Sequence, residues 1–324
     1  MTSPHDALFK AVFSDPEAAE GELRAILPAA IAARIDFSTL HLEPGSFVDE
    51  ELRSRHSDLL FSVKIAGREA RLYLLFEHRS TPDPWLAFRL LVYEVRIWEA
   101  ALASDPSRKK LPAIFPVVVH HGLIGWTAVQ EFSELLDLDD LERELFAPLL
   151  PRFAFLIDDL AVRSPDEIMG RVLPNAAKLA LMALRDVRDA MDIRTWLRTM
   201  AELIRALLAE PQGSRAFVTI IRYIFLTRSR TDVEGLAAEA ERIALGAGAP
   251  VMTTARQLIE QGIEQGLEQG IQRGARATLI RLLTLRFGPP SDLIRDRIDH
   301  ATSAELEHWT DRVLTAISIE EVLS

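Results

Sequence analysis

Two apolar runs separated by a glycine constrain the fold of this chain more than any other feature. The first run is SDLLFSVKIA, residues 57–66, and the second is EARLYLLFEH, residues 69–78. Both are short and rich in aliphatic and aromatic residues, which is typical of buried strands. A two-residue turn at Gly67 and Arg68 would join them as an antiparallel hairpin. The sequence therefore predicts a β-hairpin early in the chain.

The segments around the hairpin alternate between helical and strand patterns. Ser3 followed by Pro4 is a helix start, and Asp83–Pro84 opens a second helix that is expected to end near residue 103. The runs 113–122 and 153–158 have the short apolar cores of buried strands. Helices and strands mixed in this order predict an α/β domain.

Beyond about residue 165 the patterns are helical, and little strand pattern remains. The expected fold class is therefore α/β, a mixed sheet flanked by helices, followed by an all-α C-terminal half. The predicted divisions are an α/β domain at 1–165, a helical extension at 166–248, a glycine-repeat connector at 249–278 and a small helical domain at 279–324.

Composition limits the class of protein. The chain has 324 residues, no cysteine and a formal net charge of -11. Without cysteine there are no disulfides or thiolate metal sites, and so acidic a chain is not a general nucleic-acid coater. The N-terminus has no signal-peptide pattern, and no apolar run reaches the ~18 residues of a membrane span. We expect a cytoplasmic protein with no membrane partner.

Two carboxylates belong to the predicted hairpin. With the turn at 67–68, opposite residues sum to 135, which would place Asp58 directly across from Glu77. Like charges in this position repel, and a divalent cation between them removes that penalty. Arg79 would share the face of Glu77 and could hold a phosphate. Alternatively, Asp58 caps a turn, and Glu77 pairs with Arg79 or Arg55 at a solvated strand end.

Four blocks in sequence resemble a known family. HDALFKAVFSDP, VDEELRSRHSDLLFSVKI with LYLLFEHRSTPD, LLVYEVRIWEA and AIFPVVVHHGLIGWTA are similar, in order and spacing, to the Rpn recombination-promoting nucleases, also labelled YhgA-like transposases. The segment from about residue 279 resembles a small domain of unknown function often appended to them.

The resemblance implies a restriction-endonuclease-like core of the PD-(D/E)XK superfamily and Mg²⁺- or Mn²⁺-dependent cleavage of DNA, with a role in recombination or in defence against foreign DNA. Asp58 and Glu77 match the metal-binding acids. Arg79 stands where the superfamily has lysine and this family usually has glutamine. Asp6 matches a further acid on the first helix, or simply caps that helix. The arginine also motivates an alternative, an interaction module for DNA or protein that has lost cleavage.

Three other features have two interpretations each. In IEQGIEQGLEQGIQRGARA, residues 259–277, glycine recurs every four residues. It is either a connector helix that forms a homodimer, a role the C-terminal domain could also have, or a flexible spacer. His120 and His121 face opposite ways and are expected to be structural rather than a metal pair. The basic, aromatic stretch 214–230 either contacts DNA or packs on the first domain.

Overall fold

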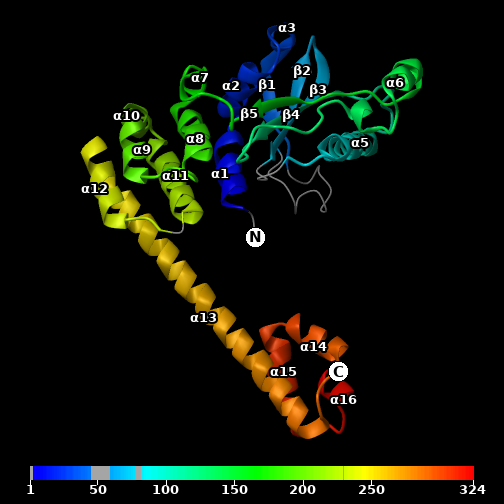
Figure 1. Cartoon of the computed structure of the whole chain (residues 1–324), viewed down its shortest axis with the longest axis vertical. Coiled ribbons are helices and arrows are strands. Elements are labelled where there is room, and N and C mark those ends of the chain that lie inside the picture. The colour runs from blue at the N-terminus through cyan, green and yellow to red at the C-terminus, as the bar shows by residue number, and fades with distance from the viewer. Residues whose placement is uncertain (1–2, 45–58, 78–81, 229) are drawn as a thin grey trace. The chain divides into compact units, whose positions relative to one another are not determined.

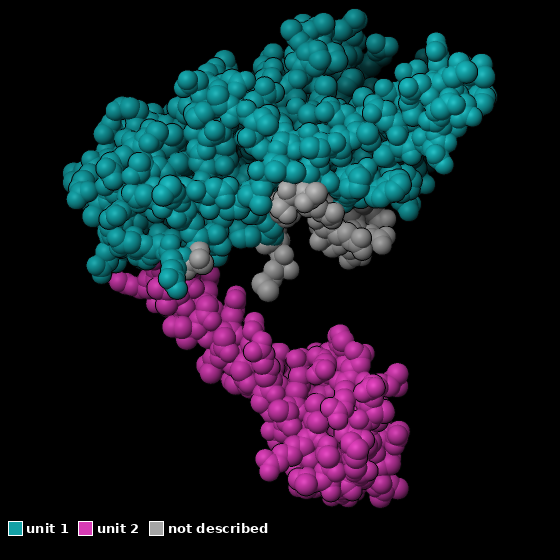
Figure 2. Space-filling view, in the orientation of Figure 1, with its two compact units in different colours: residues 1–254 teal, residues 255–324 magenta. Residues whose placement is uncertain are grey.

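The structure, a computed structural model, describes residues 3–44, 59–77, 82–228 and 230–324, with the backbone alone at residues 76 and 77. The chain divides into two compact units, residues 1–254 and 255–324 (Figure 2). No helix among the described residues is both long enough and apolar enough to cross a membrane.

The first unit is built on a five-stranded sheet with the strand order β1-β2-β3-β4-β5 (Figure 1). β2 is antiparallel to both β1 and β3, whereas β4 and β5 run parallel to β3. The strands are β1 (Ile35–Leu42), β2 (Leu59–Ile65), β3 (Arg68–Glu77), β4 (Ala113–His120) and β5 (Leu156–Asp159). The α/β class is confirmed, and β1 is a strand that the sequence analysis did not predict.

The predicted hairpin forms, but its turn is one residue earlier than expected. Ile65 pairs with Arg68, so Ala66 and Gly67 make the turn, with φ angles of 49° and 75°. Two successive positive φ values are those of a type I′ turn, whose twist matches that of the flanking strands. Glycine reaches this region without strain, which explains Gly67. The predicted turn at 67–68 is wrong.

Helices cover both faces of the sheet. Helix α1 (Pro4–Phe13) begins where predicted, because the Ser3 hydroxyl accepts a hydrogen bond from the His5 amide. Together with α2 (Pro16–Ile26) it packs on the face that carries Phe61, Leu72 and Val117. Helix α5 (Leu86–Ser104) covers the other face and contributes to a second core. The short elements are α3 (Ala29–Ala32), η2 (Phe132–Leu135), α6 (Asp140–Phe146) and η3 (Ala147–Leu149).

The helical part of the first unit shares a hydrophobic core with the face of the sheet that α1 covers. One cluster of buried residues runs from Phe9 through Leu181 and Ile221 to Val251. Its helices are α7 (Pro165–Met169), α8 (Asn175–Asp186), α9 (Ile193–Thr199), α10 (Ala201–Leu208), α11 (Gly213–Thr227) and α12 (Val233–Ile243). Within it, α11 buries its apolar face against α1, α8 and α10, which supports the packing interpretation of the stretch 214–230.

The glycine-repeat tract lies within one continuous helix, α13 (Gly248–Phe287). The tract is therefore helical rather than a coil spacer. The second unit has a small core of its own, in which Leu279 and Leu283 from the end of α13 pack with Leu306 and Trp309. Its other helices are α14 (Asp292–Asp299), α15 (Ser303–Arg312) and α16 (Ile319–Val322). Thr302 begins α15 with a capping box, as its sequence position suggests.

Candidate functional site

Three parallel strands end together at one edge of the sheet. The register pairs Glu77 of β3 with His120 of β4, and His120 with Asp159 of β5. Neighbouring strands lie ~4.8 Å apart, so these three positions form a short row across the edge. In open α/β sheets the carboxyl ends of strands are where ligands bind. This edge, Glu77, His120 and Asp159, is called the carboxyl edge below.

His120 is held on nearly every side. Its side chain is fully buried, and its Nε2 lies 3.1 Å from the carbonyl oxygen of Ile124. Because a carbonyl only accepts, Nε2 is the donor in this hydrogen bond, and the other ring nitrogen is Nδ1. That Nδ1 is buried and has no hydrogen-bond partner in the described part of the chain. Trp126 packs edge-on against the ring at 5.1 Å between centroids.

Gly122 makes room for this imidazole. A Cβ atom at Gly122 would lie 2.4 Å from Nε2 of His120, far inside van der Waals contact. Asp159 fixes the loop on the other side, since its Oδ2 accepts from the Trp126 amide at 2.6 Å and its Oδ1 from the Ala161 amide at 3.2 Å. The glycine and the carboxylate therefore determine where the ring sits.

The residue after β4 faces the other side of the sheet. His121 packs its ring 4.9 Å from that of His5, and Nδ1 of His5 lies 3.0 Å from the Tyr223 hydroxyl. Burial, with smaller contributions from His5 and Arg188, lowers the pKa of His121 to about 3, so this ring is neutral. The two histidines thus have separate surroundings, as predicted. Asp6, one of the predicted site residues, is buried in the first turn of α1, next to His5.

A buried charge network holds β5 below the edge. Arg171 contacts Asp158 through Nη1 and Nη2 at 2.7 and 2.8 Å, and its Nη1 also lies 2.9 Å from Oε2 of Glu22. Arg163 adds a further bond to Asp158. Burial raises the pKa of Glu22 to about 8, with Arg171 opposing. Glu22 therefore carries the proton of this acid pair, and Asp158 stays ionised on the guanidinium groups.

Two predicted site residues, Asp58 and Arg79, lie outside the described residues, as do the side-chain atoms of Glu77. The backbone of Glu77 ends β3, as predicted. The prediction that Asp58 lies directly across from Glu77 assumed a turn at residues 67–68. In the described register Leu59 pairs with Leu74, so the numbers of two paired residues sum to two less than the 135 assumed. A change of two residues in the pairing keeps each side chain on the same face of the sheet. The metal pair of Asp58 and Glu77 stays a prediction.

A complete set of metal ligands is absent from the residues that the structure describes. Within 3–44, 59–75, 82–228 and 230–324, no three histidine, aspartate or glutamate side chains converge as metal ligands. The carboxyl edge has two groups suited to orient the ligands of such a site. They are Nδ1 of His120, which has no hydrogen-bond partner among the described residues, and the fixed carboxylate of Asp159. A divalent ion is compatible with this edge only with ligands supplied by Glu77 and by residues beyond the described part.

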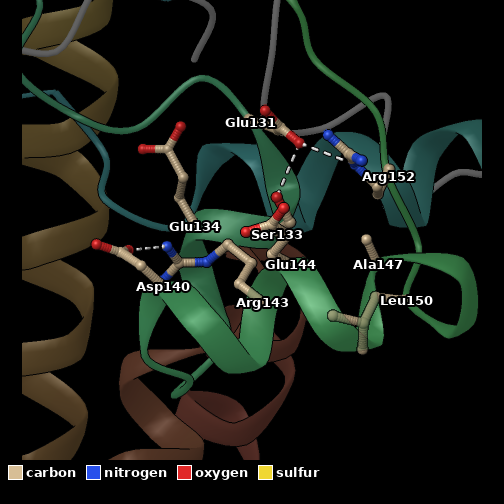
Figure 3. Close-up of a pocket in the computed structure, with 9 residues that line it drawn as sticks. All are labelled: Glu131, Ser133, Glu134, Asp140, Arg143, Glu144, Ala147, Leu150 and Arg152. Atoms are coloured by element: carbon tan, nitrogen blue, oxygen red, sulfur yellow. Dashed lines mark hydrogen bonds and ion pairs between the residues drawn. The ribbon is translucent and has the colours of Figure 1, made fainter.

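A cavity of about 400 Å³ lies elsewhere in the first unit, beside α6 (Figure 3). Four carboxylates and two arginines line it, and the arginines are engaged: Arg143 with Asp140 at 2.8 Å, and Arg152 with Glu131 at 3.3 Å. Its lining includes no histidine, and it is not part of the carboxyl edge.

Asp159 is absent from the predicted site residues, and His120 is predicted to be structural. Asp158 and Asp159 follow FAFLI, just as Glu77 follows LYLLF. A buried strand that ends in acid is common to both runs, and this pattern is the signal in the sequence that points to Asp159.

Comparison with known proteins assigns the family. The model of a family described as "Putative transposase, YhgA-like" matches residues 3–214. The chain belongs to this family. Recombination-promoting nuclease RpnD of Escherichia coli O157:H7 is 31% identical over 70% of this chain and 82% of its own length. RpnA of E. coli K12 is 38% identical over 52% of this chain and 56% of its own. No solved structure matches significantly.

The family also contains proteins described as inactive. The inactive recombination-promoting nuclease-like protein RpnE of E. coli K12 is 29% identical over 81% of this chain and 83% of its own length. This YhgA-like chain is therefore homologous to recombination-promoting nucleases, and homology by itself does not decide whether it cleaves.

Proposed function

We propose that this chain is a metal-dependent DNA endonuclease that uses Mg²⁺ or Mn²⁺. The observation that carries the proposal is the carboxyl edge, where the sheet of this chain, itself 31% identical to the nuclease RpnD, brings Glu77 into register with a buried histidine and a fixed aspartate. Asp58 and Glu77 are the proposed metal ligands, and Asp6 a proposed accessory acid. The bound ion would lower the pKa of a water molecule and offset charge on the phosphate.

The chain's own residues have separate tasks in this proposal. Arg79 holds the phosphate, because a guanidinium cannot lose its proton near neutral pH and so cannot act as the base. His120 and Asp159 keep the end of β4 and the loop at Trp126 in place. Fixed surroundings of this kind are what orient ligands in metal sites.

The decisive experiment is cleavage of DNA by the purified full chain. We expect nicking with Mg²⁺ or Mn²⁺, loss on chelation, and a loss of about 100-fold or more in Asp58→Ala and Glu77→Ala. Glu99→Gln is the matched control, because among the residues that the structure describes this exposed carboxylate pairs with Arg96 of α5 alone. Full activity in both alanine variants would falsify the proposed site.

A second function is favoured by one finding, the relatives described as inactive. In that case the fold serves as a DNA- or protein-binding module. DNA binding by wild type without cleavage at any Mg²⁺ or Mn²⁺ concentration would support this function. Arg79 in place of the family's usual glutamine would then be one cause of the lost cleavage.

We also propose that α13 joins two copies of the chain. Ile259, Ile263, Leu267 and Ile271 recur every four residues and are each about 60% exposed. The glycines between them meet nothing within 4 Å of an added Cβ, yet each costs the helix ~1 kcal/mol against alanine. A second backbone against the glycine stripe would offset that cost. Light scattering should give the mass of a dimer for wild type. It should give the mass of a monomer for the double variant Ile263→Asp with Leu267→Asp.

A further inference from the structure

A second cavity lies at the opposite end of β3 from Glu77. It has a volume of about 500 Å³ and is lined by the first residues of β3, by the end of β2 and by the segment that leads into β4. β3 has ten residues, so at ~3.3 Å per residue this cavity is roughly 30 Å from the carboxyl edge. It is called the hairpin cavity below.

The hairpin cavity has more positive charge than its carboxylate can balance. Three cations, Arg68, Arg108 and Lys110, face one acid, Glu69. Glu69 is already engaged by two guanidinium groups, by Arg108 at 2.8 Å and by Arg71 at 2.7 Å. Although partial burial opposes them, these bonds lower the pKa of Glu69.

The two remaining cations are open to a ligand. Arg68 and Lys110 are exposed, and neither makes an ion pair with any residue that the structure describes. Each comes from a different side of the cavity, Arg68 from the hairpin and Lys110 from the segment before β4. Two cations that line one cavity from separate elements suit a phosphate group, which accepts hydrogen bonds on several oxygens.

The rest of the lining is apolar. Ile65, Phe115 and Leu111 contribute to it, and Leu111 is 46% exposed. A volume of this size, with apolar walls and a few polar groups, is typical of a small-molecule site. An aromatic ring among the walls suits a flat, uncharged group attached to the phosphate.

The hairpin cavity differs in charge from the cavity beside α6. That cavity has four carboxylates and two arginines, and the whole chain carries a net charge of -11 (Figure 3). The hairpin cavity has three cations and one carboxylate, so it is a basic place in an acidic chain.

We propose that the hairpin cavity binds a phosphate-bearing small molecule, and that a nucleoside monophosphate is the class that fits it. Arg68 and Lys110 bind the phosphate, and the wall of Ile65, Leu111 and Phe115 receives the base. Because the site is at the amino ends of β3 and β4, it is separate from the proposed nuclease edge.

Calorimetric titration of the purified full chain tests this with three probes: adenosine monophosphate, adenosine and inorganic phosphate. The test variant is Arg68→Gln with Lys110→Gln. The control is Lys64→Gln with Lys109→Gln, which removes the same charge from exposed neighbours outside the lining. Arg108 is left intact because it holds Glu69. We expect the monophosphate to bind wild type and control alike, and at least tenfold more weakly to the test variant.

The other probes separate the sources of affinity. Inorganic phosphate and adenosine are each expected to bind more weakly than the monophosphate. Equal binding of the monophosphate by the two double variants, or no binding by wild type at millimolar concentration, would overturn the site. Phosphate binding as tightly as the monophosphate would overturn the role of the apolar wall. Because these titrations measure binding rather than cleavage, none of the three outcomes bears on the proposed nuclease function.

Discussion

The two ends of β3 carry opposite chemistry. At its amino end Arg68 joins Arg108 and Lys110 around one engaged carboxylate. At its carboxyl end Glu77 is in register with a buried histidine and an aspartate. The middle of the strand is apolar and buried on both faces. A strand of this kind acts as a spacer, so charges of opposite sign are kept far enough apart to serve two sites without neutralising each other.

The ends also differ in how firmly they are held. At the carboxyl edge almost every polar atom described is bonded within the fold, and Nδ1 of His120 is the exception. At the amino end Arg68 and Lys110 extend from the surface. Fixed groups suit chemistry that needs exact geometry, whereas long exposed cations suit a ligand that they can adjust to.

The largest expected effect at the carboxyl edge comes from removing the guanidinium of Arg171, which holds β5 through Asp158. Arg171→Leu leaves Glu22 and Asp158 buried without their shared cation, and we expect a loss of about 3 kcal/mol in the free energy of unfolding. Denaturant titration measures it. Arg96→Leu, which breaks the exposed pair with Glu99, should cost under about 1 kcal/mol. Similar losses in both variants would contradict a structural role for the network.

Displacing the His120 ring tests whether the carboxyl edge depends on fixed geometry. Gly122→Ala puts a Cβ 2.4 Å from Nε2 of the ring, and His120→Ala removes the ring. If the ring orients the site, both should lower cleavage about tenfold, with metal affinity reduced in calorimetry. His41→Ala, which removes an exposed histidine of β1 outside the carboxyl edge, is the control for cleavage. Unchanged cleavage and metal binding in both edge variants would show that His120 only fills space.

The pH dependence of stability tests which acid holds the proton. The pKa of Glu22 is raised from 4.5 to about 8, so the folded chain keeps a proton that the unfolded chain releases in this range. The contribution is complete below about pH 4.5 and is lost as pH rises toward 8. We expect the midpoint of thermal unfolding to fall by a few degrees from pH 5 to 8, and to fall less in Glu22→Gln. Parallel curves would contradict the assignment.

The smallest expected change is at position 79. Arg79→Gln restores the residue that the family usually has, and we expect a fall of a few-fold in the cleavage rate, since a neutral amide can orient water but holds the phosphate less firmly than a guanidinium does. Single-turnover cleavage measures it. A higher rate would contradict the proposed role of Arg79 in holding the phosphate.

Much of the fold could be predicted from local pattern. The apolar runs around residues 60, 74 and 118 identify strands because a buried strand needs a short continuous apolar core, and Ser3 and Thr302 identify helix starts through their caps. β1 was missed because its pattern, IDFSTLHL, alternates weakly and contains polar residues that face solvent. The turn was misplaced by one residue because Ala66 takes a positive φ, which its identity does not suggest.

For the site, local pattern is enough to show which strands end in acid. It places Glu77 at the end of a strand and His120 and His121 on opposite faces, since side chains alternate along a strand whatever surrounds it. Two other features come from the folded chain alone: Glu77, His120 and Asp159 share one edge of the sheet, and Arg68 and Lys110 line one cavity. The order and direction of strands in a sheet depend on contacts between residues far apart in the chain, and no local pattern contains them.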